Sequence, residues 1–323
     1  MKAQRKPCQR SSLKEGNESM LVAVIGIGSN SVRMLTACVQ GGQFERLGRD
    51  RAGTRLFGGL DEKGNLSAKS MQDTVDAVRQ MHQRALNSGA EKVHIFATSA
   101  VRDAGNQKDF CRMILESTGI EMEICSGEKE AALSFLGATE GERSGVIDIG
   151  GGSTEYVIGQ GMKIDEAVSL QMGAVRLHRQ MPIANESDVM RVTALAAGIF
   201  ENGAQPIVKL PRPREWVGVG GTFTTLASLV HELPWSDRSR THGTVITYEA
   251  ALRFARRLSE MTVEERLALM GLQPHRADIV VHGICILLAS MEKLGIGKIK
   301  VSTYGNVDGY IKARYGCESA KCS

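Results

Sequence analysis

Aromatic residues, excess charge and paired cysteines are all scarce in this sequence. Aromatic residues make up 5% of the 323 residues, the net charge is +4, and no stripe of Lys and Arg alternates with aromatic side chains. Proteins that bind nucleic acid usually combine a strongly basic surface with rings on which bases stack. The composition therefore argues against a nucleic-acid partner, and any preference for anions must be local.

Disulfide, zinc and membrane signals are also missing. The seven cysteines are scattered and form no CxxC pair, which argues against a disulfide framework or a zinc site and favours a reducing cytoplasm. The most apolar stretch, residues 279–291, contains His282 and Gly283 and is too short to span a bilayer. Residues 1–19 carry five Lys and Arg but no apolar segment, so they are expected to form a disordered basic leader rather than a signal peptide.

Two similar runs, 122 residues apart, are the most informative feature that is present. Residues 25–32 read IGIGSNSV and residues 147–154 read IDIGGGST, and a second apolar run follows each of them. This pattern predicts two β-hairpins with turns of Gly, Ser and Asn. Backbone N–H groups converge in such turns and hydroxyls add donors, so each turn can wrap an anionic oxygen. The duplication predicts two similar halves that hold a phosphorylated ligand between them.

The segments between these runs predict an α/β protein. Ser67 can cap a helix whose apolar residues Met71, Val75, Val78 and Met81 share one face, and a strand at 93–97, a helix at 107–117 and a strand at 120–125 follow. This alternation indicates an α/β layer over residues 20–126. The second half, 127–323, is expected to repeat the plan with a hairpin at 146–158, helices at 186–203, 249–260, 263–270 and 275–293, strands at 216–219 and 298–302, and a final helix from residue 306 that is free to pack back on the first domain.

Several residues near the turns suit phosphate or a metal ion. Asp148 ends the strand before the second turn and Glu155 lies just after it, and carboxylates in such a place suit Mg²⁺. Arg33 and Arg102 follow the first turn and the segment ATSAV, where guanidinium groups would suit phosphate. The run GVGGTFTTL from Gly218 goes from strand to helix, which predicts another anion site at a helix N-terminus. Arg176 is a weaker candidate, and His242 and His282 are expected to be packing or surface residues because no second ligand lies at metal spacing.

Seven segments together carry a resemblance to a known family. They are VAVIGIGSNSVRM (22–34), ATSAVRDAGN (97–106), SGEKEA (126–131), VIDIGGGSTE (146–155), MGAVRL (172–177), GVGGT (218–222) and RADIVVHG (276–283). In this order and spacing the set resembles the exopolyphosphatase / guanosine pentaphosphate phosphohydrolase family, over residues 20–312. The resemblance implies two ribonuclease-H-like domains of the actin-like ATPase superfamily around a phosphate cleft. It also implies release of the terminal phosphate from inorganic polyphosphate or guanosine pentaphosphate, by a chain similar to the family's short form.

The resemblance also implies roles for individual residues. Glu130 would be the general base that activates water, although its spacing alone does not distinguish it from Glu128 or from an ordinary glutamate of a first helical turn. Asp148 and Glu155 would hold Mg²⁺ or Mn²⁺. The residues implied in substrate binding come from the three glycine-rich turns and two arginines: Gly28, Ser29, Asn30, Ser31, Arg33, Arg102, Gly150, Gly151, Gly152, Ser153, Thr154, Gly220, Gly221 and Thr222.

One position departs from the family pattern. Gly26 stands where the first turn of the family usually carries an aspartate, so a carboxylate that would help to hold the metal is missing. We expect Gly26→Asp to lower the metal requirement if this position faces Asp148. Two rival functions remain: an ATP-dependent small-molecule kinase of the same superfamily, and a catalytically weak sensor of polyphosphate or guanosine phosphates. The sequence ranks neither the two substrates nor a monomer against a homodimer.

Overall fold

The two Gly- and Ser-rich runs form the turns of two β-hairpins, as predicted. In the computed structural model, which describes residues 19–316, strands β1 (Met20–Ile27) and β2 (Val32–Gln40) pair antiparallel, as do β6 (Arg143–Ile149) and β7 (Thr154–Gln160). Each hairpin gains a third antiparallel strand that the sequence analysis did not anticipate, β3 (Gln43–Ala52) and β8 (Lys163–Leu170). The predicted leader lies outside the described residues except for residue 19.

Parallel strands extend each three-stranded unit into a mixed sheet. The first sheet has the order β3-β2-β1-β4-β5, in which β4 (Lys92–Ala97) and β5 (Glu123–Ile124) run parallel to β1. The second has the order β10-β11-β9-β6-β7-β8, in which β9 (Glu215–Val219) is parallel to β6 and to β11 (Lys298–Val301), and β10 (Val245–Thr247) is antiparallel at the edge. The predicted α/β class is therefore confirmed.

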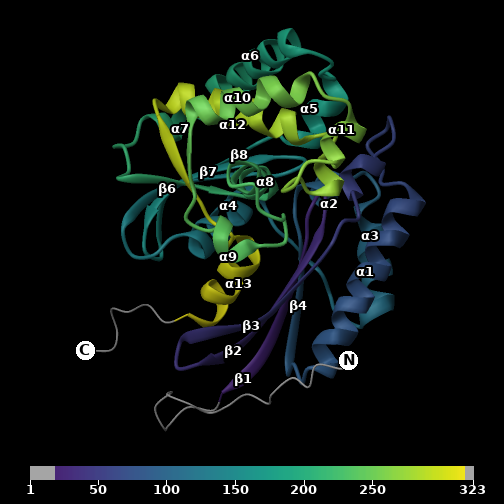
Figure 1. The fold of residues 1–323 in the computed structure, drawn as a ribbon. Coiled ribbons are helices and arrows are strands. Elements are labelled where there is room, and N and C mark those ends of the chain that lie inside the picture. Colours follow the sequence, from purple (N-terminus) through teal and green to yellow (C-terminus); the bar gives the residue numbers. More distant parts are fainter. Residues whose placement is uncertain (1–18, 317–323) are drawn as a thin grey trace.

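Amphipathic helices cover the outer face of the first sheet (Figure 1). Helix α1 (Ala68–Asn87) begins where the Ser67 hydroxyl accepts a hydrogen bond from the Ser70 amide, and its apolar residues Met71, Val75, Val78 and Met81 are buried as predicted. Helix α3 (Gln107–Thr118) lies beside it, and both share a core with the Ile25 side of β1. This packing fixes the end of β1 at which the first turn begins.

The second sheet has a thicker outer layer, in which α6 (Glu186–Gly203), α10 (Tyr248–Ser259) and α12 (Val280–Leu294) lie together (Figure 1). Helix α8 (Gly221–Val230) starts at the end of β9. The predicted helix at 275–293 is in fact two elements, because Pro274 opens a separate 3₁₀ turn before α12. The remaining short helices are α2 (Ser99–Arg102), α5 (Ala174–Gln180), α7 (Gln205–Val208), α9 (Arg238–Thr241), α11 (Val263–Leu267), η1 (Leu56–Gly59) and η2 (Pro274–Arg276).

Two helices fill the space between the sheets. Helix α13 (Asn306–Tyr315) buries apolar residues against β1 and β2, and α4 (Gly127–Ala138) does so against β6, β7 and β9. The helices touch each other through Gly137 and Gly309: a Cβ at Gly309 would lie 1.7 Å from the Leu133 carbonyl oxygen. The contact between the two inner helices therefore depends on glycine, and it holds the starts of α4 and α13 close to both turns.

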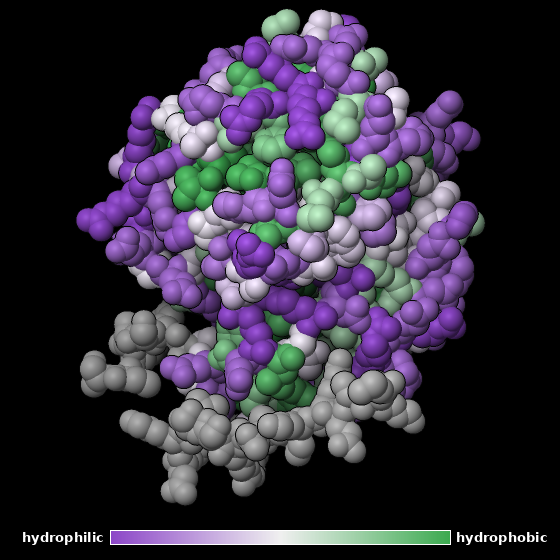
Figure 2. Space-filling model, viewed as in Figure 1, coloured by the Kyte–Doolittle hydropathy of each residue, from purple (hydrophilic) through white to green (hydrophobic). Residues whose placement is uncertain are grey.

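The viewed face of the molecule is mostly hydrophilic (Figure 2). Hydrophobic residues show between hydrophilic ones over the upper helical layer. Across residues 19–316, the helices are all too short or too polar to cross a membrane.

Candidate active site

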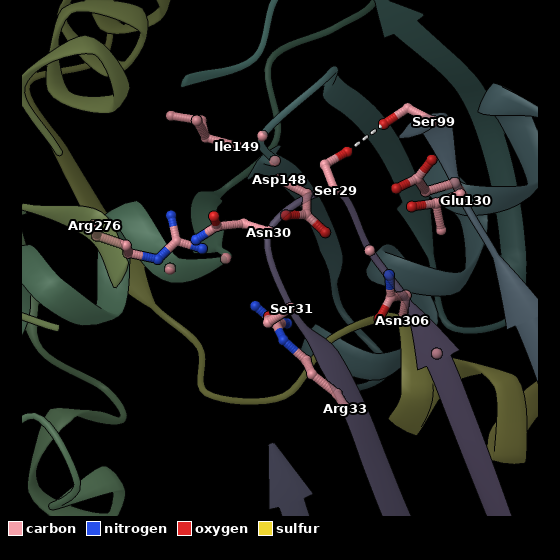
Figure 3. A pocket seen from close by; sticks show the side chains of 17 residues that line it. Ser29, Asn30, Ser31, Arg33, Ser99, Glu130, Asp148, Ile149, Arg276 and Asn306 are labelled. Atoms are coloured by element: carbon pink, nitrogen blue, oxygen red, sulfur yellow. Dashed lines mark hydrogen bonds between the residues drawn. The ribbon is translucent and has the colours of Figure 1, made fainter. Parts of the chain in front are cut away.

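A small cavity opens where the two turns and the N-terminal ends of several helices meet (Figure 3). Its volume is about 60 Å³. The residues that line it come from both halves of the chain: Gly26, Gly28, Ser29, Asn30, Ser31, Arg33, Thr98, Ser99, Glu130, Asp148, Ile149, Gly150, Gly151, Gly220, Gly221, Arg276 and Asn306. The structure thus brings together most of the residues that the sequence assigns to a phosphate site.

The two turns lie against each other at this cavity. A Cβ at Gly151 would lie 2.9 Å from the Ser29 Cβ, and the Ser29 hydroxyl is also hydrogen-bonded, at 3.0 Å, to that of Ser99 at the start of α2. Gly220 and Gly221, at the start of α8, add the amide groups of a helix N-terminus to the same wall. Converging amides of this kind favour a bound anion.

Glu130 supplies a carboxylate to the cavity from the first turn of α4. It is only 6% exposed, and burial raises its pKa to about 7 even though the Arg102 guanidinium favours the charged form. The Arg102 Nη1 atom donates to Glu130 Oε2 at 3.1 Å and to the Cys125 carbonyl oxygen at 3.0 Å. Arg102 does not itself line the cavity, and it contacts the cavity through Glu130.

Asp148 lies between Glu130 and the arginines (Figure 3). It is 8% exposed, its Oδ2 atom accepts a hydrogen bond from the Ser134 hydroxyl, and burial raises its pKa. Arg33 and Arg276 oppose that rise through their positive charge. Asp148 is therefore a buried carboxylate that is open to the cavity on one side.

Glu155 lies beside Asp148 but does not border the cavity. The two residues are opposite each other on β7 and β6, and Glu155 is 1% exposed with its Oε1 atom accepting from the Ser169 hydroxyl at 2.8 Å. Burial raises its pKa well above the usual value, and the nearby charges of Glu130 and Asp148 raise it further. Glu155 is therefore a buried carboxylate next to Asp148, on the same face of the sheet, that does not itself border the cavity.

Two arginines face the carboxylates. Burial lowers the pKa of Arg33, whereas Asp148 favours its charged form. Arg276 is 3% exposed, its Nε atom has no hydrogen-bond partner, and burial and the charge of Arg33 lower its pKa to about 9. A Cβ at Gly221 would lie 1.9 Å from the Arg276 Cζ atom, so glycine there makes room for the guanidinium. Sequence reasoning missed Arg276 and Asn306, although Arg276 opens one of the segments that carry the resemblance.

Other predicted residues lie outside the lining. Gly152, Ser153, Thr154 and Thr222 do not border the cavity. The Arg176 guanidinium donates to the Gly152 carbonyl oxygen at 2.7 Å and to Asp103 at 2.9 Å. The Nε2 atom of His282 lies 3.0 Å from the Met181 carbonyl oxygen, and the His242 ring lies 4.8 Å from that of Tyr304.

The space beside Gly26 is filled. A Cβ at this position would lie 2.8 Å from the Phe96 Cζ atom and 2.9 Å from the Val307 Cγ1 atom. The Phe96 ring is itself stacked on Tyr310, with ring centroids 5.1 Å apart. A carboxylate introduced by Gly26→Asp would therefore reach the cavity only with a shift of the Phe96 or Val307 side chain.

The side chains at the cavity could hold a hard cation such as Mg²⁺ only together with the phosphate oxygens of a substrate. Within residues 19–316, no group of three or more His, Cys, Asp or Glu side chains is arranged to hold a metal ion. Mg²⁺ commonly uses one or two carboxylates, several waters and the phosphate oxygens of a substrate. Asp148 and Glu130 are the two buried carboxylates that border the cavity, and Asp148 also ends the strand that leads into the second turn.

Comparison with known proteins places this arrangement in one family. A family model described as the Ppx/GppA phosphatase family matches residues 35–314. The chain is similar to exopolyphosphatase 2 of Mycobacterium tuberculosis, with 30% identity over 309 residues that cover 89% of this chain and 96% of the relative. Among solved structures, the Aquifex aeolicus Ppx/GppA enzyme has 29% identity and a TM-score of 0.77 over 92% of this chain and 100% of its own. An exopolyphosphatase from Cytophaga hutchinsonii has 26% identity and a TM-score of 0.81 over 92% and 99%. These structures confirm the predicted two-domain, actin-like fold.

Proposed function

Because this chain belongs to the Ppx/GppA phosphatase family, we propose that it is an exopolyphosphatase that releases the terminal orthophosphate of inorganic polyphosphate. The observation that carries the proposal is Glu130: a carboxylate whose pKa is raised to about 7 borders a cavity lined by two anion-binding turns. A general base works best when its pKa lies near the working pH. The names of the similar exopolyphosphatases support the same choice of substrate.

The reaction follows from the positions of the side chains. The turns at 28–31 and 150–151 hold the terminal phosphate through amides and hydroxyls. Glu130 takes a proton from a water molecule, whose oxygen attacks the terminal phosphorus from the side opposite the bridging oxygen. The bond between phosphorus and the bridging oxygen breaks, and the shortened chain leaves with the electron pair. Arg33 and Arg276 bind the oxygens of the phosphate through their positive charge.

A divalent cation belongs to the proposal as well. Asp148 would hold Mg²⁺ or Mn²⁺ together with phosphate oxygens, and the cation would neutralise charge on the transferred phosphate. Glu155 would support Asp148 from the neighbouring strand, where Ser169 holds its carboxylate. Guanosine pentaphosphate, which also ends in a phosphoanhydride, is the other substrate that this chemistry would accept.

A catalytically weak polyphosphate-binding protein is the second candidate. Gly26 favours it, because Phe96 and Val307 occupy the space that a further carboxylate would need. Such a protein would keep the turns and the arginines but would turn over slowly.

The test is phosphate release from long-chain polyphosphate with Mg²⁺ and no nucleotide. We expect release at a rate typical of enzymes, about 1–10³ per second. Binding of polyphosphate without release would favour the binding protein. Transfer of phosphate from ATP to a hydroxyl compound, with no release from polyphosphate, would instead support a kinase.

A further inference from the structure

A second, larger pocket adjoins the catalytic cavity. Its volume is about 220 Å³, and Arg33 and Gly220 border both spaces. Its lining comes mainly from β3, from the segment after α8 and from the loop before α13. The lining residues are Arg33, Arg49, Asp50, Arg51, Val219, Gly220, Thr224, Trp235, Ser236, Arg238, Thr241, Gln273, Ser302, Thr303 and Tyr304. We name this space the arginine pocket. The inner cavity is small enough to suit the end of a chain, so the rest of a long substrate must lie elsewhere.

The arginines of this pocket lack sufficient counter-charge. The Nε and Nη2 atoms of Arg51 are buried without a hydrogen-bond partner, while its Nη1 atom donates to Gln273. Burial, together with repulsion from Arg276, Arg33 and Arg238, lowers the pKa of Arg51 to about 8. A buried donor without a partner and several like charges cost free energy, and a bound anion would offset both costs.

Neighbouring groups hold the arginines in place. Arg46 Nε lies 2.7 Å from the Oδ1 atom of Asp308, and Arg49 binds the same carboxylate, which is fully buried. The Arg46 Cζ atom lies 4.1 Å from the centre of the Tyr304 ring, and that of Arg49 lies 5.2 Å from it. The Tyr304 ring is thus already covered by guanidinium groups rather than open to a nucleobase.

We propose that the arginine pocket binds the phosphates that follow the terminal one in an inorganic polyphosphate chain. The inference rests on the proposed function and deepens it, because it selects polyphosphate over guanosine pentaphosphate. Each further phosphate unit of the chain carries a negative charge, which Arg51 and Arg238 can neutralise. Aromatic rings on which a guanine base could stack are few here, because Arg46 and Arg49 cover Tyr304 and Trp235, 42% exposed, is the other aromatic residue of the lining.

The first experiment measures binding without turnover. Long-chain polyphosphate is titrated in EDTA into the native protein, Arg51→Gln and the control Arg79→Gln, which removes one charge from the exposed face of α1. We expect Arg51→Gln to weaken binding about 10-fold or more and Arg79→Gln to leave it unchanged. Arg238→Gln gives a second test of the same pocket if Arg51→Gln does not fold. Equal affinity of the native protein and of the folded arginine variants would overturn the proposal, even if phosphate release with Mg²⁺ upheld the proposed function.

The second experiment separates the two substrates. With Mg²⁺ present, Arg51→Gln should raise KM for long-chain polyphosphate about 10-fold while kcat stays within about threefold, because Arg51 does not border the catalytic cavity. Arg79→Gln should leave that KM unchanged. If Trp235→Ala instead raises KM for guanosine pentaphosphate and Arg51→Gln has no effect on polyphosphate, the pocket recognises a nucleoside and the proposal is wrong. Absence of any phosphate release from the native protein would refute the proposed function, whereas the titration in EDTA would still decide the binding role of the pocket.

Discussion

The hairpins β1–β2 and β6–β7 have the same backbone hydrogen bond in their turns but differ at one pair of facing residues. Each turn is closed by the same bond, from Gly28 N–H to the Ser31 carbonyl oxygen at 3.1 Å and from Gly150 N–H to that of Ser153 at 3.0 Å. Two residues before each turn glycine, the strands place Gly26 opposite Arg33 in the first hairpin and Asp148 opposite Glu155 in the second. In the first pair, Gly26 has no side chain and Arg33 carries a positive charge, whereas both residues of the second pair carry carboxylates.

The two copies of the motif therefore have one feature in common and one that differs. Both turns keep the converging amides that suit a phosphate, since those depend on the backbone. The side chains at the matched pair then set the charge on each side of the cavity. The first hairpin offers Arg33, which we call the basic wall, and the second offers Asp148 beside Glu130, which we call the acidic wall. We therefore expect changes on the acidic wall to slow turnover and changes on the basic wall to weaken substrate binding.

The largest effect should come from the acidic wall at Glu130. Glu130→Gln keeps the size of the side chain and its contact with Arg102 but removes its basicity, so kcat should fall about 10²- to 10⁴-fold, the range expected for a general base. Phosphate release is the measurement. The exposed neighbour Glu128, changed to Gln, is the matched control and should keep native activity. Equal losses in both variants would remove Glu130 from the mechanism.

Asp148→Asn should have the next largest effect. Losing the carboxylate that faces the cavity should lower kcat roughly 10²- to 10³-fold and raise the Mg²⁺ concentration needed for half-maximal rate, because the amide binds a hard cation less well. A metal titration of phosphate release measures both changes. Asp73→Asn, on the exposed side of α1, is the control. Full activity with native metal dependence in Asp148→Asn would mean that the metal is held elsewhere.

Arg33→Lys tests the basic wall and should act on binding. Lysine keeps the charge but lacks the planar fork that matches phosphate, so KM should rise about 10-fold with kcat within about threefold. Steady-state kinetics on polyphosphate separate the two constants, and Arg79→Lys is the control. A fall in kcat larger than the rise in KM would contradict the division of work between the walls.

The smallest effect should come from the empty position of the first pair. Gly26→Ala introduces a Cβ into space that Phe96 and Val307 already fill, so we expect the free energy of unfolding to fall by about 1–3 kcal/mol, as for other overpacked sites. Denaturant unfolding measures the change. Gly48→Ala, where a Cβ would meet nothing within 4 Å, should cost clearly less. Equal stability of the two variants would mean that the space beside Gly26 is not tightly packed.

Local patterns predicted those parts of the structure that local physics determines. The hairpin turns follow from glycine and hydroxyl residues, α1 follows from its Ser67 cap and apolar spacing, and α6 has the predicted bounds 186–203. Strand β3 was missed because its sequence, QFERLGRDRA, is mostly exposed and shows little alternation. Its pairing with β2 depends on the adjacent sheet, which a local pattern does not contain.

The site was predictable where it uses the turns and less so where distant segments meet. Arg276 reaches the cavity only because Gly221, 55 residues earlier, leaves room for its guanidinium. Likewise, Phe96 and Val307 fill the space at Gly26 from β4 and α13, and Arg102 turns toward Glu130 rather than toward the cavity. Such contacts depend on side-chain packing between elements far apart in the sequence, so neither composition nor spacing indicates them.

The pH dependence of kcat/KM for polyphosphate tests the central claim, that a buried carboxylate on the acidic wall acts as the base. Burial raises the pKa of Glu130 to about 7, and a base must be deprotonated to accept a proton, so activity should be lost as the pH falls through about 7. Glu130→Gln should lose this limb together with most of the activity, whereas Glu128→Gln should keep the native profile. A residual activity in Glu130→Gln that rises with pH as the native activity does, or a native profile that is flat between about pH 5.5 and 8.5, would contradict the account.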